Sequence, residues 1–481
     1  MIMQHVSRYV PRGVLGALAL LFVVARPTAA QIRQTGLTEA PREYLDKVPV
    51  AFSPFGGDSL PHRADLSPSL PPPGNQGQQG SCVAWTVAYA LRSYQAHVRE
   101  RAPLIVAPGT IDSTRVFSPA FVYNQINNGR NAGTYFGDAL NLVQEIGAVP
   151  LSEMPYDAAD FVSQPDSATI ADAARYRLLS WKRVDFRDMI EIKSQVNAGY
   201  PVMIGARVDS AFMQGGKDFV WRAAGGPPRG GHAMLVVGYD DDRHAVRVMN
   251  SWGKDWGDGG YFWLDYDFFP VVVNEAYVAK DRAVPAAPSR RELPVFGPVP
   301  AVVTIVPSRP TIPERVVPKV RTVVPPFARV VIPSLRPPAP SVFDDAKVTI
   351  IRTRQDASDS LLGRGIRFDG LVSVPAGAQG SLQVVIHLFV DSAGHKGRFI
   401  RATSSRFSVG RERAATGTSP FPLLSSGAIN RAWVAFLPYS ALDLSHEAAG
   451  VVRIVAEPVL YVDRFGVKAG SAATIACQCG R

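Results

Sequence analysis

Apolar residues recur at helical spacing in the first part of the chain and at strand spacing after it. Val83, Val87 and Leu91 are separated mainly by small residues, which is typical of a buried helix. The pattern predicts helices over residues 83–97, 118–126 and 138–146, the last ended by Gly147. Strands are predicted over residues 201–205, 233–239, 245–249 and 261–264. A helical half followed by a β-rich half indicates two lobes with a cleft between them.

The pattern changes again in the last two fifths of the chain. Fifteen prolines fall between positions 285 and 340 without helical or strand period, which is typical of a semi-rigid extended spacer. Beyond it, strand-like runs cover residues 366–374, 382–390, 431–437 and 451–462. We therefore expect an α+β fold class, with a two-lobed domain over residues 48–283, a proline-rich basic linker over 284–341 and an accessory all-β sandwich over 342–481.

The first thirty residues have the pattern of an export signal. Arg8 and Arg12 precede an apolar run over residues 14–25, and the small residues Thr28, Ala29 and Ala30 offer a cleavage point. The apolar run is too short for a comfortable membrane span. We expect residues 1–30 to be a signal peptide, residues 31–47 to form a leader or N-terminal arm, and the mature protein to be periplasmic or secreted.

Composition and charge narrow the choice of partners. The 481 residues are 46% hydrophobic and 19% charged, as in a globular protein. The formal net charge is +10, but much of it lies in the linker, which implies no groove for nucleic acid. A plain spacer is the simpler interpretation of these basic residues. Attraction to anionic polymers or lipids of a cell envelope is the alternative.

The cysteines and acidic residues do not predict a metal or a cofactor. The chain has three cysteines, Cys82, Cys477 and Cys479, too few for a disulfide framework, and a bond between the last two would close a strained ring. Cys477 and Cys479 lack the further ligands of a zinc site. The acidic run 240–242 lacks the spacing of a calcium loop and is interpreted as a hairpin turn. Phosphate-loop and zinc-helix motifs are absent from the sequence.

Four residues have the side chains of a nucleophilic cysteine site. Cys82 stands where the first helical pattern begins, and the partial positive charge of a helix N-terminus favours a thiolate. His232 opens a predicted strand after a run of small residues, so a substrate backbone can approach its ring. Asn250 ends the next strand, and an antiparallel return would bring its amide beside His232. Gln76 has an amide that can donate to an oxyanion together with the Cys82 N–H.

Each residue taken alone has a simpler explanation. A lone cysteine in a helix is usually a small buried hydrophobe, and a lone histidine at a strand start is usually structural. Trp252 would normally count as core, although it can also cover the contact between His232 and Asn250 and exclude water. The occurrence of all these residues in this order is what points to chemistry.

The motifs around these residues resemble those of the papain-like cysteine peptidases. They are Asn75-Gln76-Gly77, Gly80-Ser81-Cys82, Gly231-His232-Ala233 and Asn250-Ser251-Trp252-Gly253-x-x-Trp256-Gly257-x-x-Gly260-Tyr261. The resemblance covers roughly residues 48–280. It implies a two-lobed fold, a peptide or protein substrate and no cofactor. It also implies Cys82 as nucleophile, His232 as its ion-pair partner and general acid/base, Asn250 as the group orienting the ring, and Gln76 as an oxyanion donor.

The same resemblance suggests substrate-binding positions and shows departures. Ala233 would lie beside the pocket for the second residue on the acyl side. The glycine-containing strip that pairs with a substrate backbone is either 128–129 or 132–133, and Gly133 is the candidate carried forward. Val83 stands where the family usually has Trp, and Gln79 replaces a disulfide cysteine. The long inhibitory propeptide is missing, so some other control is expected.

The leading hypothesis is an exported cysteine peptidase that hydrolyses peptide bonds through an acyl-enzyme. One alternative keeps the scaffold but makes it a processing enzyme or transpeptidase with a narrow substrate. The other is a peptide-binding or envelope-structural protein whose peptidase lobe is silent, which the β-domain on a long spacer motivates.

Overall fold

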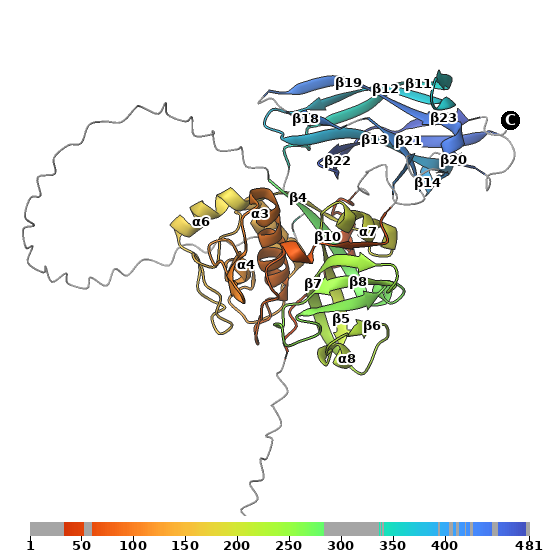
Figure 1. The fold of residues 1–481 in the computed structure, drawn as a ribbon. Helices are drawn as coiled ribbons and strands as arrows, with labels where there is room; N and C mark the ends of the chain where they lie inside the picture. The colour runs from red at the N-terminus through yellow and green to blue at the C-terminus, as the bar shows by residue number, and fades with distance from the viewer. Residues whose placement is uncertain are drawn as a thin grey trace, which may run out of the picture.

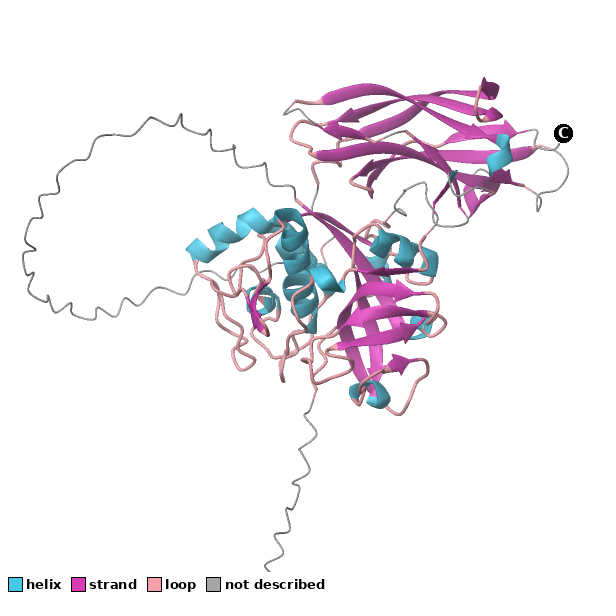
Figure 2. Ribbon diagram, viewed as in Figure 1, coloured by secondary structure: helices cyan, strands magenta, loops and turns pink. Residues whose placement is uncertain are grey.

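The computed structural model describes residues 33–51, 60–282, 336, 338 and 341–477, the last range with gaps at 393–394, 404–406, 410–412, 419, 424–426 and 445–450. A part with two lobes of helices and strands is followed by an all-β part (Figures 1 and 2). The predicted signal peptide and most of the predicted linker lie outside the described residues. None of the helices in the described part combines the length and the apolar composition that crossing a bilayer requires.

The first lobe is built around one continuous helical run. It passes from α2 (Cys82–Ala84) through the π-helix η2 (Trp85–Arg92) into α3 (Ser93–Glu100). Two further helices, α4 (Pro119–Ile126) and α5 (Phe136–Glu145), share its core, where Val87, Leu91, Phe121 and Leu140 are fully buried. Ser118 caps α4 by accepting the Phe121 N–H at 3.2 Å. The three predicted helices are therefore confirmed to within a few residues.

Smaller elements complete this lobe and its N-terminal approach. They are α1 (Arg42–Leu45), the 3-10 turns Ser67–Ser69 and Ala174–Tyr176, the hairpin β2 (Ile105–Ala107) and β3 (Thr110–Ile111), and α6 (Ser167–Ala173).

An eight-stranded sheet forms the second lobe. Its order is β4 (Leu178–Arg183), β10 (Val273–Asp281), β5 (Val202–Asp209), β7 (Pro228–Asp240), β8 (Ala245–Met249), β9 (Tyr261–Asp265) and β6 (Val220–Trp221), with β1 (Arg63–Asp65) paired to β7. The short helices α7 (Met189–Asn197), α8 (Ser210–Met213) and α9 (Phe269–Val272) flank it. The four predicted strands correspond to β5, β7, β8 and β9, whereas β4 and β10 were not predicted.

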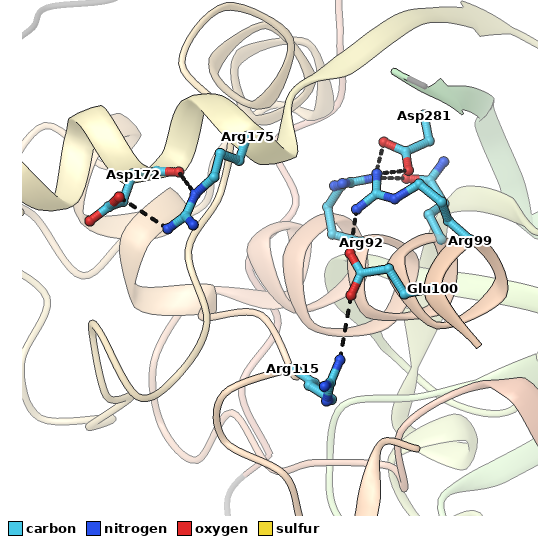
Figure 3. Close-up of polar contacts among 8 residues, drawn as sticks. Arg92, Arg99, Glu100, Arg115, Asp172, Arg175 and Asp281 are labelled. Atoms are coloured by element: carbon cyan, nitrogen blue, oxygen red, sulfur yellow. Dashed lines mark hydrogen bonds and ion pairs between the residues drawn. The ribbon is translucent and has the colours of Figure 1, made fainter. Parts of the chain in front are cut away.

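An ionic network fixes the end of the sheet against the helical run (Figure 3). Asp281, the last residue of β10, accepts from Arg92 of η2 at 2.8 Å and also pairs with Arg99 of α3. Arg99 pairs with Glu100 at 2.8 Å, and Glu100 pairs with Arg115 at 3.4 Å. Because the Arg92 side chain is fully buried, this network holds the helix that begins at Cys82 in one position relative to the sheet.

The C-terminal part confirms the predicted all-β sandwich. One sheet contains β11 (Lys347–Asp359), β12 (Gly363–Val374) and β19 (Ile429–Pro438). The other is built on β13 (Gly380–Ser392) and β21 (Val452–Val462), with β14 (His395–Phe399), β15 (Arg401–Ala402), β16 (Ser408–Val409), β17 (Arg413–Gly417), β18 (Phe421–Leu423), β20 (Leu442–Asp443), β22 (Phe465–Ala469) and β23 (Ala473–Cys477) around them. Inward residues such as Phe368 and Ile386 share one apolar core.

The turn between β21 and β22 contacts the two-lobed part. Tyr200 donates its hydroxyl to the Asp463 carbonyl at 2.7 Å, and its ring packs on Phe465 with centroids 5.1 Å apart. Lys280 donates to the Asp463 carboxylate at 2.8 Å. Lys182 is buried against the Val467 carbonyl, and burial lowers the pKa of its ammonium to about 8.

We expect the Asp463→Ala variant to unfold at a lower urea concentration than the unmodified chain. Its carboxylate accepts from Lys280 and from the Ser381 N–H, and losing both lowers the free energy of unfolding by about 1 kcal/mol at this half-exposed position. Asp267→Ala, which removes a highly exposed carboxylate, is the control. Equal midpoints for the two variants in urea titrations followed by fluorescence would contradict the expectation.

Candidate active site

Cys82 lies between the two lobes at the first residue of α2. Its sulfur accepts the Ala233 N–H from β7 at 3.4 Å, so the thiol sits against the strand that carries His232. The backbone N–H groups of Val83 and Gly36 also lower the pKa of the thiol. These amides favour the anion, as expected for a cysteine at a helix N-terminus. Cys82 is the one free cysteine among the residues that the structure describes.

The His232 ring is held by two residues that follow the next strand. Nε2 lies 2.8 Å from the Asn250 Oδ1, and Trp252 stacks on the ring with centroids 4.5 Å apart and planes inclined by 23°. Because an oxygen accepts at Nε2, Nε2 carries the proton of the neutral ring and Nδ1 carries the lone pair. Nδ1 has no hydrogen-bond partner among the described residues. In this tautomer, Nδ1 is the ring atom that can accept a proton.

Gln76 is fully buried and engaged at both ends of its side-chain amide. Its oxygen accepts from the Ser251 hydroxyl at 2.6 Å. Its nitrogen donates to the carbonyls of Gln79 at 2.9 Å and Gln34 at 3.1 Å. The sequence predicted this nitrogen as an oxyanion donor, and in the structure a backbone carbonyl of the N-terminal segment occupies one of its hydrogen bonds.

Residues 33–40, which we call the arm, run between the lobes beside the thiol. The Leu37 N–H donates to the Gly231 carbonyl at 3.0 Å, on the strand of the second lobe. On the first lobe, Thr134 donates to the Gly36 carbonyl at 2.9 Å and accepts from the Thr38 N–H at 3.0 Å. The arm is thus hydrogen-bonded to both lobes. On the second lobe the contact is one residue before His232, and on the first lobe it is in the loop that leads into α5.

The arm explains why the site is closed to solvent. Its Gln34 carbonyl accepts from the Trp252 indole at 3.0 Å as well as from Gln76, and Gly36 lies against the backbone of Gly80. Cys82 and His232 each have 0% of their surface exposed. The sequence predicts some form of control, but residues 33–40 have no pattern that identifies them as its source.

The predicted substrate-binding residues lie on the two sides of the arm. Gly133 faces Thr38, because a Cβ added at Gly133 would come within 2.9 Å of the Thr38 hydroxyl. The neighbouring residue Thr134, which sequence analysis did not single out, makes the backbone hydrogen bonds. Within the described residues, the alternative strip at 128–129 makes no hydrogen bond to the arm. Ala233 is buried opposite Gly205, in register across β5 and β7.

Burial favours the neutral forms of the thiol and the imidazole in the arm-covered state. It raises the pKa of Cys82 to about 12 and lowers the pKa of His232 to about 4, in each case because the charged form loses contact with water. Both directions oppose the predicted thiolate–imidazolium pair while the arm is in place, and the pair itself stays a prediction. The amides around the sulfur and Asn250 oppose these shifts but do not overcome desolvation.

One surface cluster has the donors of a cation site. His244, Asp265 and Asp267 place one ligand atom each within 4.8 Å of the others, at the far ends of β8 and β9. Two of the three are exposed, and the cluster is separate from Cys82. The acidic run 240–242 lies at the turn between β7 and β8, as predicted.

Known proteins resemble the two-lobed part. Residues 60–281 match the papain family cysteine protease profile. The chain is 26% identical over 210 residues to an uncharacterized peptidase C1-like protein of Acanthamoeba polyphaga mimivirus, covering 40% of this chain and 64% of that protein. It is 30% identical over 188 residues to gamete and mating-type specific protein A of Dictyostelium discoideum, covering 39% and 38%.

Among solved structures, xylellain, a cysteine protease from Xylella fastidiosa, aligns with a TM-score of 0.44 and 22% identity, over 52% of this chain and 95% of that one. The chain spans less than two thirds of the length of the curated relatives named above.

We expect Gly36→Ala to unseat the arm and make Cys82 more reactive. A Cβ at Gly36 would lie 2.2 Å from the Gly80 carbonyl oxygen, a backbone atom that cannot rotate away. Solvent then lowers the pKa of the thiol, and each unit of decrease gives about tenfold more thiolate at neutral pH. The measurement is the rate of iodoacetamide labelling at pH 7.5.

Gly216→Ala is the matched control, since a Cβ there meets no atom within 4 Å. A rate for Gly36→Ala no higher than that of the control would show that the arm does not shield the sulfur.

Proposed function

Residues 60–281 belong to the papain family of cysteine proteases, and from this premise we propose that the chain is an exported cysteine peptidase that hydrolyses peptide bonds through an acyl-enzyme on Cys82. The observation that carries the proposal is the arrangement of His232. Its Nε2 is fixed by Asn250 at 2.8 Å, and its Nδ1 has no hydrogen-bond partner in the described part of the chain. The Cys82 sulfur accepts the N–H of Ala233, the residue after His232.

The proposed reaction starts with transfer of the thiol proton to His232 Nδ1. The thiolate attacks the substrate carbonyl carbon, a C–S bond forms, and the carbonyl π electrons move to the oxygen. The N–H of Cys82 and the Gln76 Nε2–H stabilise this oxyanion. Collapse of the intermediate breaks the C–N bond, and His232 gives its proton to the leaving amine. Water, deprotonated by His232, then attacks the thioester and releases the acid and the thiol.

Entry of a substrate requires the arm to leave. The Gln34 carbonyl holds one hydrogen bond of the Gln76 amide, and Gly36 covers the sulfur, so departure of the arm frees the oxyanion donor and the nucleophile together. Contact with water then returns the pKa of the thiol and of the imidazole toward their ordinary values, where the charged pair forms more readily. Asn250 and Trp252 keep the ring in place throughout.

Export rests on the pattern of the first thirty residues, and an accessory role for the β-sandwich rests on its place beyond the proline-rich stretch. We propose that this sandwich holds a substrate, a partner or a cell-envelope surface near the peptidase. Its packing on Tyr200 and Lys182 places it on the sheet side of the two-lobed part.

A second candidate is a binding or envelope-structural protein that keeps the lobe silent, and the arm-filled site is the observation that favours it. The processing or transpeptidase alternative shares the acyl-enzyme and differs in the acceptor. Release of a peptide–amine conjugate when a peptide amine is added in excess separates it from a simple hydrolase.

We expect an epoxide-type thiol-protease inactivator to modify Cys82 and no other described residue, as read by peptide mass mapping of the Gly36→Ala chain. In the same background, Cys82→Ala is expected to lower peptide hydrolysis by about a thousandfold or more, because the reaction loses its nucleophile. Far-ultraviolet circular dichroism checks that the fold is retained. Hydrolysis by the Cys82→Ala variant at the rate of its parent would contradict the peptidase proposal. Modification of residues other than Cys82 alone would contradict it too.

A further inference from the structure

Arg336, near the C-terminal end of the predicted linker, is bound by the first lobe. Its Nη2 donates to both carboxylate oxygens of Glu145, each at 2.7 Å. Its carbonyl oxygen accepts from the Asn141 Nδ2 at 2.6 Å and from the Tyr44 hydroxyl at 3.2 Å. The side chain and the backbone of one arginine are thus held together, by three residues that lie between 191 and 292 positions earlier in the chain.

The two groups that bind the Arg336 carbonyl are held in place by the first lobe itself. Asn141 is fully buried, and its Oδ1 accepts from the Trp181 indole at 3.1 Å, which leaves the amide nitrogen for Arg336. Tyr44 lies over the first turn of α5, because a Cβ added at Gly137 would come within 2.1 Å of its hydroxyl oxygen. Burial raises the pKa of Tyr44, so the hydroxyl keeps the proton that it donates. Buried donors such as these need an acceptor, and Arg336 supplies it.

The position of Glu145 favours a cationic partner. Glu145 is the last residue of α5, and the last turn of this helix contains no basic residue. The C-terminal end of a helix has partial negative charge, which disfavours a carboxylate there unless a cation lies beside it. The guanidinium of Arg336 provides that cation through two charge-assisted hydrogen bonds.

Tyr44 connects this site to the arm. It belongs to α1, which begins two residues after the arm ends at residue 40. The N–H groups of Tyr44 and Leu45 donate to the Pro41 carbonyl at 3.0 and 3.1 Å, so α1 is fixed to the residue that directly follows the arm. Anchoring of α1 keeps the arm close to its place between the lobes and raises its effective concentration there.

We propose that Tyr44, Asn141 and Glu145 form a binding site for a cationic segment of this chain, with Arg336 as its ligand. Arg336 bound there holds α1, and α1 in turn holds the arm over Cys82. The end of the segment that leads into the β-sandwich thereby controls access to the thiol at the other side of the first lobe's core. This inference concerns the covered state of the thiol and requires no peptide hydrolysis.

The first test measures iodoacetamide labelling of Cys82 in the full chain at pH 7.5, read on the Cys82 peptide by mass spectrometry. Labelling of a covered thiol requires the arm to open, so its rate reports the opening equilibrium. Arg336→Ala removes the guanidinium that pairs with Glu145, and we expect labelling about fivefold to tenfold faster. Arg336→Lys keeps the positive charge and should label more slowly than Arg336→Ala.

Arg175→Ala is the matched control for the loss of an arginine. Arg175 also pairs with a carboxylate of the first lobe, Asp172, at 3.0 Å (Figure 3), and it makes no hydrogen bond to α1 among the described residues. Its removal should leave the labelling rate unchanged. A rate for Arg336→Ala no higher than that of Arg175→Ala would overturn the proposal.

The second test exchanges the two charges. Arg336→Glu and Glu145→Arg each place like charges side by side, so each variant alone should label faster than the unmodified chain. The double variant restores an ion pair, and its rate should return toward that of the unmodified chain, as expected for two directly interacting side chains. A double variant that labels as fast as the faster single variant would contradict direct recognition.

The third test examines the link through α1. Tyr44→Phe removes the hydroxyl that donates to the Arg336 carbonyl and keeps the ring, so labelling should be about threefold to fivefold faster. In the Arg336→Ala background the same change should have no further effect, because the carbonyl has already left the site. Equal acceleration by Tyr44→Phe in both backgrounds would show that Tyr44 acts on the arm without Arg336 and would overturn the link.

The outcomes are independent of the proposed function. A chain that hydrolyses no peptide would count against the peptidase proposal, and its labelling rates would still report whether Arg336 holds the arm.

Discussion

The arm, residues 33–40, excludes water from the site, and this desolvation governs the pKa values of Cys82 and His232. The arm is hydrogen-bonded to Gly231 on one lobe and Thr134 on the other, and it removes Cys82 and His232 from water. In that environment the charged forms of both groups are disfavoured, even though amides point at the sulfur and Asn250 holds the ring. The contact between His232 and Asn250 is formed in this state, while burial beneath the arm disfavours the charged forms of the thiol and the ring.

The supports of this geometry come from elements far apart in the chain. The helical run that begins at Cys82 is tied through Arg92 to Asp281 at the end of β10. β7 contributes His232 toward the aromatic cluster around Trp252 and Ala233 toward the thiol, because successive residues of a strand face opposite sides. A single strand thus carries both His232 and the amide that contacts the Cys82 sulfur.

Hydrophobic periodicity predicted most of the helices and strands that carry the site. The position of the arm and of β10 depends on contacts between distant parts of the chain. The helices around Val87 and the strands β7 and β8 have clear periodicity, so they and the contact between His232 and Asn250 followed from the sequence. The arm has no such signal, since its conformation is imposed by backbone hydrogen bonds that any residue can make. Strand β10 was missed for a related reason, because its partners β4 and β5 come much earlier in the chain and its place in the sheet is decided by tertiary contact. The predicted ion pair stays a prediction, because periodicity does not report what covers a site, and burial under the arm disfavours both charges.

The arm is part of the same polypeptide as the site that it covers. Its occupancy is an intramolecular equilibrium with a fixed effective concentration, so dilution of the protein leaves it unchanged. A single cut in the chain between the arm and Cys82 converts that equilibrium into a bimolecular one, in which the released fragment is lost to the surroundings. Covalent continuity, rather than the strength of any one hydrogen bond, therefore makes the closed state persistent. A cut that ends this continuity makes the loss of the closed state irreversible.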